Sequence, residues 1–197
     1  MKKEVNEMKS VTENEYTLEI KNSKFIGLIF PIEKNTDIDI LLDQAKNKYQ
    51  NATHYCYAYI LDQKRYATDD KEPNGTAGIP ILQVLEKQEL NHVLCIIIRY
   101  FGKIKLGANG LIRAYTKTAT EVIKNHTIIL KEAFLVKISF SYSNLKQINY
   151  LLKDKKNIQK EFKNNITYTL ALENEEINKM KKIKEISIKI IKKIYLP

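Results

Sequence analysis

Residues 92–115, HVLCIIIRYFGKIKLGANGLIRAY, determine how the first half of the chain folds. The apolar run 93–98 ends at Arg99, which is typical of a strand buried on both faces of a sheet. Gly102, Gly107 and Gly110 follow, and apolar residues then recur at helical spacing from about residue 109 to 125. The pattern predicts a buried strand, a glycine-rich turn and a helix, whose core residues would be Leu111, Ile112, Tyr115, Ala119, Val122 and Ile123.

This turn is also a candidate anion site. Backbone N–H groups at the start of a helix attract anions, because the helix dipole is positive there. Arginine and lysine side chains nearby add donors that suit a phosphate of RNA or an acidic partner. The candidate residues are Arg99, Gly102, Lys105, Gly107, Gly110 and Arg113.

Two alternatives bear on this site. The spacing from Gly102 to Gly107 matches a P-loop, but Ala108 and Asn109 stand where Lys and Ser/Thr would have to hold phosphate and magnesium, so an ATPase or GTPase is not predicted. In the other alternative the segment is a tight turn with solvated lysines, and its arginine pairs with a nearby carboxylate.

A second loop, DDKEPNGTAGIP (69–80), places three carboxylates within four positions: Asp69, Asp70 and Glu72. Hard oxygen ligands of this kind suit magnesium, so these residues are candidate metal ligands. Loop carboxylates also commonly accept hydrogen bonds from turn and helix-cap N–H groups. In a third possibility, these acids neutralise Arg99 or Arg113 and hold the two loops together.

The remaining pattern predicts two α+β units. Residues 1–132 contain predicted strands at 16–20, 23–32, 53–61 and 92–100, and predicted helices at 37–49, 79–88 and 109–125. Residues 133–197 give strand 134–141, helix 144–153, strands 157–162 and 166–173, helix 174–183 and strand 185–195. This β-α-β-β-α-β order is that of ferredoxin-like folds.

Composition excludes several classes of protein. The 197 residues carry a net charge of +10, with 19 basic and 17 acidic residues in 1–132 against 14 and 6 in 133–197. The apolar runs are far shorter than the roughly 20 residues of a membrane-spanning helix, and the start lacks the apolar stretch of a secretory signal. We therefore expect a cytoplasmic protein without membrane contact. Cys56 and Cys95 lie in apolar runs, which favours buried thiols over disulfides or zinc.

The strand THYCYAYIL (53–61) offers two further candidates. Tyr55, Tyr57 and Tyr59 share one face, where they either stack on RNA bases or pack against a helix. His54 and Cys56 share the other face, but residues two apart on a strand are poorly placed for a nucleophilic dyad.

Four segments together resemble the IMPACT family, including its bacterial YigZ-type members. They are SKFIG (23–27), ATHYCYAY (52–59), DDKEPNGTAGIPIL (69–82) and IIIRYFGKIKLGANGLIRAY (96–115). The resemblance implies a first domain like the second domain of a small-subunit ribosomal protein, and a ferredoxin-like second domain. It also implies a role in translation, because the eukaryotic relatives regulate translation through a partner protein. The family offers no established catalytic residues.

This sequence departs from the family pattern at four positions. Lys71, Lys103 and Asn109 stand where glycine is usual, and Asn74 where serine is usual. Asn tolerates left-handed backbone geometry, so Asn109 fits a turn. Lys103 would be strained if the family glycine has positive φ.

The sequence thus predicts a cytoplasmic, translation-associated regulator that binds RNA or a ribosome-associated partner, without catalysis and without a cofactor. The alternative is a metal-assisted enzyme that acts on a small anionic substrate or a nucleotide through Asp69, Asp70 and Glu72.

Overall fold

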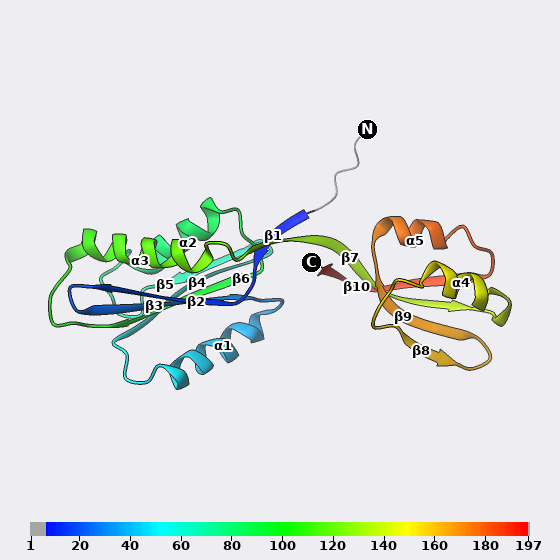
Figure 1. Ribbon diagram of the computed structural model, residues 1–197, viewed down its shortest axis with the longest axis horizontal. Coiled ribbons are helices and arrows are strands. Elements are labelled where there is room, and N and C mark those ends of the chain that lie inside the picture. Colours follow the sequence, from blue (N-terminus) through cyan, green and yellow to red (C-terminus); the bar gives the residue numbers. More distant parts are fainter. Residues whose placement is uncertain (1–6, 197) are drawn as a thin grey trace. The chain divides into compact units, whose positions relative to one another are not determined.

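The structure is a computed structural model that describes residues 7–196. It divides into two compact units (Figure 1). The first is Met8–Ile129, and the second comprises residues 130–196 together with Glu7.

The first unit is built on an antiparallel sheet of five strands in the order β2-β3-β6-β4-β5. The central strand β6 carries the apolar run 93–98, and all six of these residues are 0% exposed. Burial on both faces explains why this run is not interrupted by polar residues. The strands are β2 (Asn14–Ile20), β3 (Ser23–Pro31), β4 (His54–Leu61), β5 (Lys64–Thr68) and β6 (Val93–Tyr100).

Helices cover both faces of this sheet (Figure 1). One face packs against α1 (Asn35–Lys48) and the other against α2 (Gly78–Lys87) and α3 (Gly107–Ile123). Asp37 lies in the first turn of α1 and accepts hydrogen bonds from two backbone N–H groups just before the helix, as expected of a capping residue.

Two short strands of the described chain were not predicted. β5 is mostly polar and exposed, so it lacks the alternation that marks a half-buried strand. β1 (Glu7–Val11) is placed by tertiary contacts, among them a parallel bridge between Lys9 and Leu90. The prediction that Ile112 belongs to the core is wrong, because this side chain is 38% exposed. The buried side of α3 instead includes Ala114 and Thr118.

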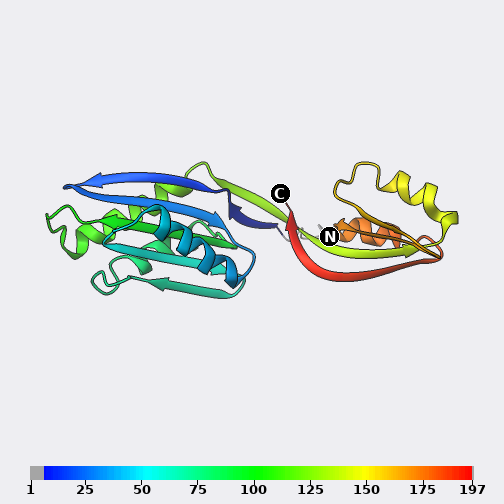
Figure 2. The ribbon, with the colours of Figure 1, turned by 90° about the horizontal axis from the view of Figure 1, so that it is seen from below.

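The second unit has the predicted β-α-β-β-α-β order, and its strands pair antiparallel in the order β10-β7-β9-β8. They belong to a five-stranded sheet that also includes β1 beside β7. β7 and β10 pair along most of their lengths (green and red in Figure 2). Both helices contribute to one core, through Ile148 and Ile177. The elements are β7 (Thr127–Phe140), the 3-10 turn η1 (Tyr142–Asn144), α4 (Leu145–Leu151), β8 (Gln159–Phe162), β9 (Ile166–Leu172), α5 (Asn174–Met180) and β10 (Ile186–Leu196). Within residues 7–196, no helix combines the length and apolarity needed to cross a membrane.

Candidate functional site

The four segments singled out in the sequence meet at one end of the sheet of the first unit. Gly102 N–H donates to the Ser23 hydroxyl at 3.1 Å, which joins the turn after β6 to the start of β3. Phe101 N–H donates to the Thr53 hydroxyl at 3.0 Å, and Thr53 N–H donates to the Arg99 carbonyl at 2.8 Å. These bonds fix the end of β6 between β3 and β4.

A buried ion pair between Arg99 and Glu72 lies at the centre of this site. Arg99 Nη1 is 2.6 Å from Glu72 Oε1, and the two side chains are 6% and 2% exposed. The Tyr115 hydroxyl donates to the same carboxylate oxygen at 2.8 Å. Through these two contacts, the Glu72 carboxylate joins the 69–80 loop to both β6 and α3.

The guanidinium is enclosed by aromatic rings. Arg99 Cζ lies 5.4 Å from the centroid of Phe25 and 5.3 Å from that of Phe101. Its Nε is buried and has no hydrogen-bond partner. The expectation that Arg99 contacts an outside anion does not fit this placement, because the charge is neutralised from within. The alternative in which Glu72 pairs with Arg99 is what the structure contains.

The other two loop carboxylates have different internal partners. Asp69 accepts hydrogen bonds from the N–H groups of Gly75, Ala77 and Gly78 at 2.8–2.9 Å, so it closes the loop and caps the start of α2. Asp70 accepts a hydrogen bond from the N–H of Tyr55 at 2.6 Å. Among residues 7–196, no three His, Cys, Asp or Glu side chains form a metal-binding group. Asp69, Asp70 and Glu72 thus each have a hydrogen-bond partner of their own inside the fold.

His54 and Cys56 also face this network without forming a dyad. His54 Nδ1 lies 2.8 Å from the Asp70 carbonyl, and its Nε2 is 3.8 Å from Glu72 Oε1. The Cys56 thiol donates to the Asp69 carbonyl at 3.0 Å. Burial raises the pKa of this thiol to about 12. A nucleophilic cysteine needs a lowered pKa, so this environment does not support covalent catalysis.

Two of the turn glycines have structural reasons to be glycine. A Cβ on Gly102 would lie 2.0 Å from the Asn22 backbone carbon, so the turn passes directly against the β2–β3 hairpin. Gly107 has φ +71° and opens α3 in a conformation that favours glycine. Gly110 has a less strict requirement, with Leu106 Cβ at 3.0 Å from a built Cβ.

The outer surface of the turn is basic and open. Lys103, Lys105 and Arg113 are all exposed, as are the first three residues of α3. This helix has no side-chain cap and no acidic residue in its first turn. Its N–H groups and positive dipole end are therefore available to an anion from outside.

The three tyrosines of β4 are buried or half-buried, and each contacts another part of the first unit. Tyr59 is 5% exposed and stacks on Tyr66 of β5, with ring centroids 5.5 Å apart. Tyr57 lies 5.7 Å from the same ring, and Tyr55 donates its hydroxyl to the Tyr49 carbonyl. These contacts agree with the packing alternative for this face.

Three residues of the network could not be assigned their roles from the sequence. Tyr115 was expected in the core because of its helical spacing, but no pattern marks its hydroxyl as a donor to Glu72. Ser23 and Thr53 act through single hydroxyls on backbone groups across the sheet. Such contacts depend on the tertiary fold rather than on local spacing.

The Impact N-terminal domain family matches residues 21–123, which contain all four segments of this site. The chain belongs to the IMPACT family. It is 34% identical over 170 residues to the IMPACT family member YvyE of Bacillus subtilis, a match that covers 83% of this chain and 78% of that relative. It is 29% identical over 114 residues to the IMPACT family member YigZ of Escherichia coli, covering 55% and 56%.

A solved structure supports the fold of this IMPACT family member. The crystal structure of a hypothetical protein matches with a TM-score of 0.69 at 23% identity, covering 94% of this chain and 98% of that one. The match spans both units, so their folds, each taken by itself, have a counterpart in an experimental structure.

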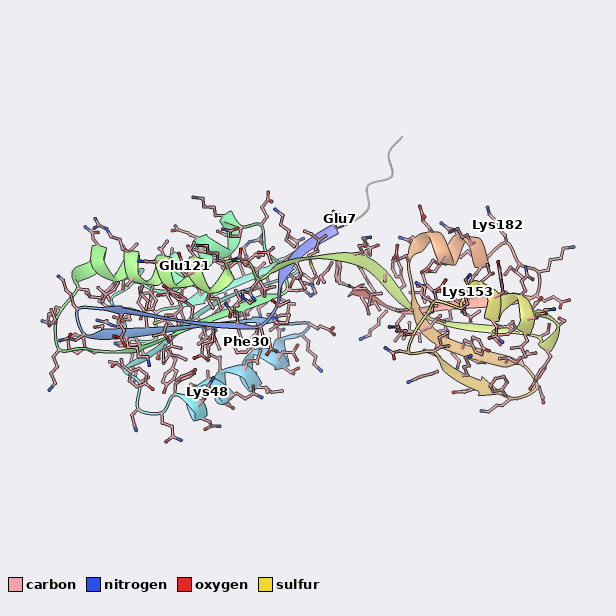
Figure 3. The ribbon with its side chains drawn as sticks, in the orientation of Figure 1. Glu7, Phe30, Lys48, Glu121, Lys153 and Lys182 are labelled. Carbon is pink, nitrogen blue, oxygen red and sulfur yellow. The ribbon has the colours of Figure 1, made fainter. Side chains whose placement is uncertain are left out.

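The ion pair can be tested by a double-mutant cycle. Arg99→Met and Glu72→Gln should each lower the free energy of unfolding by about 3–5 kcal/mol, because each leaves one buried charge without its partner. The double variant should lose less than the sum of the two by at least about 1 kcal/mol, measured by urea unfolding. Glu121→Gln is the control, since Glu121 of α3 (labelled in Figure 3) is half-buried and its ion pair with the exposed Lys124 is long, at 3.9 Å. Additive losses would contradict the direct pairing.

The backbone conformation of Lys103, which stands where the family usually has glycine, can be tested by its effect on the free energy of unfolding. Lys103 has φ +65°, where a side chain costs about 1 kcal/mol. Lys103→Gly should therefore raise the free energy of unfolding by up to about 1 kcal/mol in a urea titration. Lys105→Gly removes the same charge two residues away, where φ is not positive, and should lower stability instead. Equal effects of the two substitutions would rule out backbone strain as the cause.

Proposed function

We propose that this IMPACT family member is a translation-associated regulator that binds RNA through the exposed start of α3, without catalysis. The translation role follows from the family resemblance. The observation that carries RNA binding is the open first turn of α3, a helix of seventeen residues. This turn has no capping side chain, and the nearby Lys105 and Arg113 are exposed.

The chemistry of this surface suits phosphate. Backbone N–H groups at a helix start, together with lysine and arginine side chains, are common phosphate donors in complexes with nucleic acids. The net charge of +10 and a pI of about 9.3 add attraction that does not depend on sequence. Arg99 is not among the proposed RNA contacts, because it is buried and paired with Glu72. The proposed contacts are Lys105, Arg113 and the backbone of Gly107 and Gly110.

The second unit extends this proposal. We assign it to the ferredoxin-like class on its element order and strand pairing. Residues 133–197 carry 14 of the basic side chains and only 6 acidic ones. This excess supports polyanion binding over a role limited to an uncharged protein partner.

Binding to a fluorescein-labelled single-stranded RNA of 12 nucleotides tests the proposal, with anisotropy measured in 50–300 mM KCl. The apparent Kd of the wild-type protein should rise steeply with salt. The variant Lys105→Ala/Arg113→Ala should bind more weakly and lower the slope of log Kd against log salt by about 1.4, because each phosphate contact on a single strand contributes about 0.7.

The matched control is Lys34→Ala/Lys46→Ala, which removes two exposed charges at α1 on the opposite face of the sheet. It should leave the slope within about 0.5 of the wild-type value. Binding that is independent of salt, or equal losses in both variants, would contradict an RNA site at α3.

A further inference from the structure

One face of the sheet in the second unit is free of helices. Along β9 buried and half-buried residues alternate, and the buried set packs with α4 and α5. In β7, Val136 and Ile138 belong to this core, so Lys137 and Ser139 point to the other face. We call this second surface the open face.

The strand register places two lysines directly opposite each other on the open face. Lys137 of β7 pairs with Lys189 of β10. A third lysine, Lys192 of β10, pairs with Leu135, two residues from Lys137 along β7. All three lysines are exposed. Within residues 7–196, none of them has a carboxylate at ion-pair distance, whereas the neighbouring Lys193 contacts Glu132. Like charges opposite each other destabilise a sheet, so this arrangement has a cost in the free protein.

The positive charges continue into a row of hydroxyl groups. Ser139 pairs with Ser187 in the register, and Thr169 pairs with Lys137. At the end of this row lies a cavity of about 440 Å³, lined by Ser139, Ser141, Ser187 and Asn165 among others. The cavity lining also includes Glu185, and Glu161 of the edge strand β8 pairs with Thr167 of β9. Hydroxyl and amide donors beside lysines match the oxygens of a sugar-phosphate chain.

We propose that the open face is a second RNA surface that binds the sugar-phosphate backbone rather than the bases. The paired lysines supply charge for two neighbouring phosphates, and the serine and threonine hydroxyls reach phosphate and 2′-hydroxyl oxygens. Residues 135–139 of β7 and their direct partners on β9 and β10 include no aromatic side chain on this face, so the surface lacks the stacking platform that reads bases. The inference rests on RNA being the ligand proposed above, and it adds a site separate from α3.

The opposed lysines Lys137 and Lys189 should affect both the stability of the protein and its affinity for RNA. Lys137→Thr/Lys189→Thr removes the repulsion and places residues of high strand propensity on the face. The urea midpoint of unfolding should therefore rise. The same variant should bind the 12-nucleotide RNA about tenfold more weakly at 50 mM KCl and lower the salt slope by about 1.4. A role in folding alone would not move stability and binding in opposite directions.

The matched control is Lys153→Thr/Lys182→Thr, which removes two charges beside α4 and α5 (both lysines are labelled in Figure 3). It should change the slope by less than about 0.5. A Lys137→Thr/Lys189→Thr variant that binds like this control would overturn the open face as an RNA surface, as would a lowered urea midpoint.

The two double variants distinguish the open face from the α3 site, because each removes the charges of one site alone. Loss of binding in Lys137→Thr/Lys189→Thr but not in Lys105→Ala/Arg113→Ala supports the open face and overturns the α3 site. Loss in both double variants, each beyond its own control, supports both surfaces. Absence of RNA binding by the wild-type chain at 50 mM KCl overturns both.

Discussion

The Arg99–Glu72 ion pair is the interaction on which the first unit depends. It is almost inaccessible to water, and the Tyr115 hydroxyl completes it on the same oxygen. A buried charge is tolerated only when its partner is held in place, so the loop that carries Glu72 must be fixed. Asp69 fixes it by accepting three backbone hydrogen bonds at the start of α2. The ion pair and the loop therefore support each other.

This arrangement separates structure from recognition. The loop acids and Arg99 are used inside the fold, where they hold β3, β4, β6 and α3 together at one end of the sheet. The first turn of α3 and the basic residues around it stay exposed, and the proposed RNA contacts lie there. In the second unit the same division holds between a helix-covered core and an open, lysine-bearing face. Burial raises the pKa of the Cys56 thiol to about 12, so this cysteine of the loop network stays protonated and serves as a hydrogen-bond donor.

Much of the architecture was predictable because the local periodicity of apolar residues indicates the strands and helices. The run 93–98 indicated a strand buried on both faces, and the βαββαβ order followed from alternating strand and helix patterns. The direction of Arg99 was not predictable, because its partner lies 27 residues away and an arginine at a strand end can face either side. β5 was missed since its exposed polar residues carry no alternation, and Ile112 was misplaced by an apolar pattern wider than the buried stripe of α3.

Native-state hydrogen exchange tests most directly whether the ion pair holds the loop. The N–H groups of residues 75, 77 and 78, which donate to Asp69, report on the loop itself. In Arg99→Met their protection should fall by at least about 100-fold, the loss expected when a buried pair worth about 3 kcal/mol is broken. Unchanged protection of these three amides in that variant would show that the loop is ordered without Arg99 and would contradict the account.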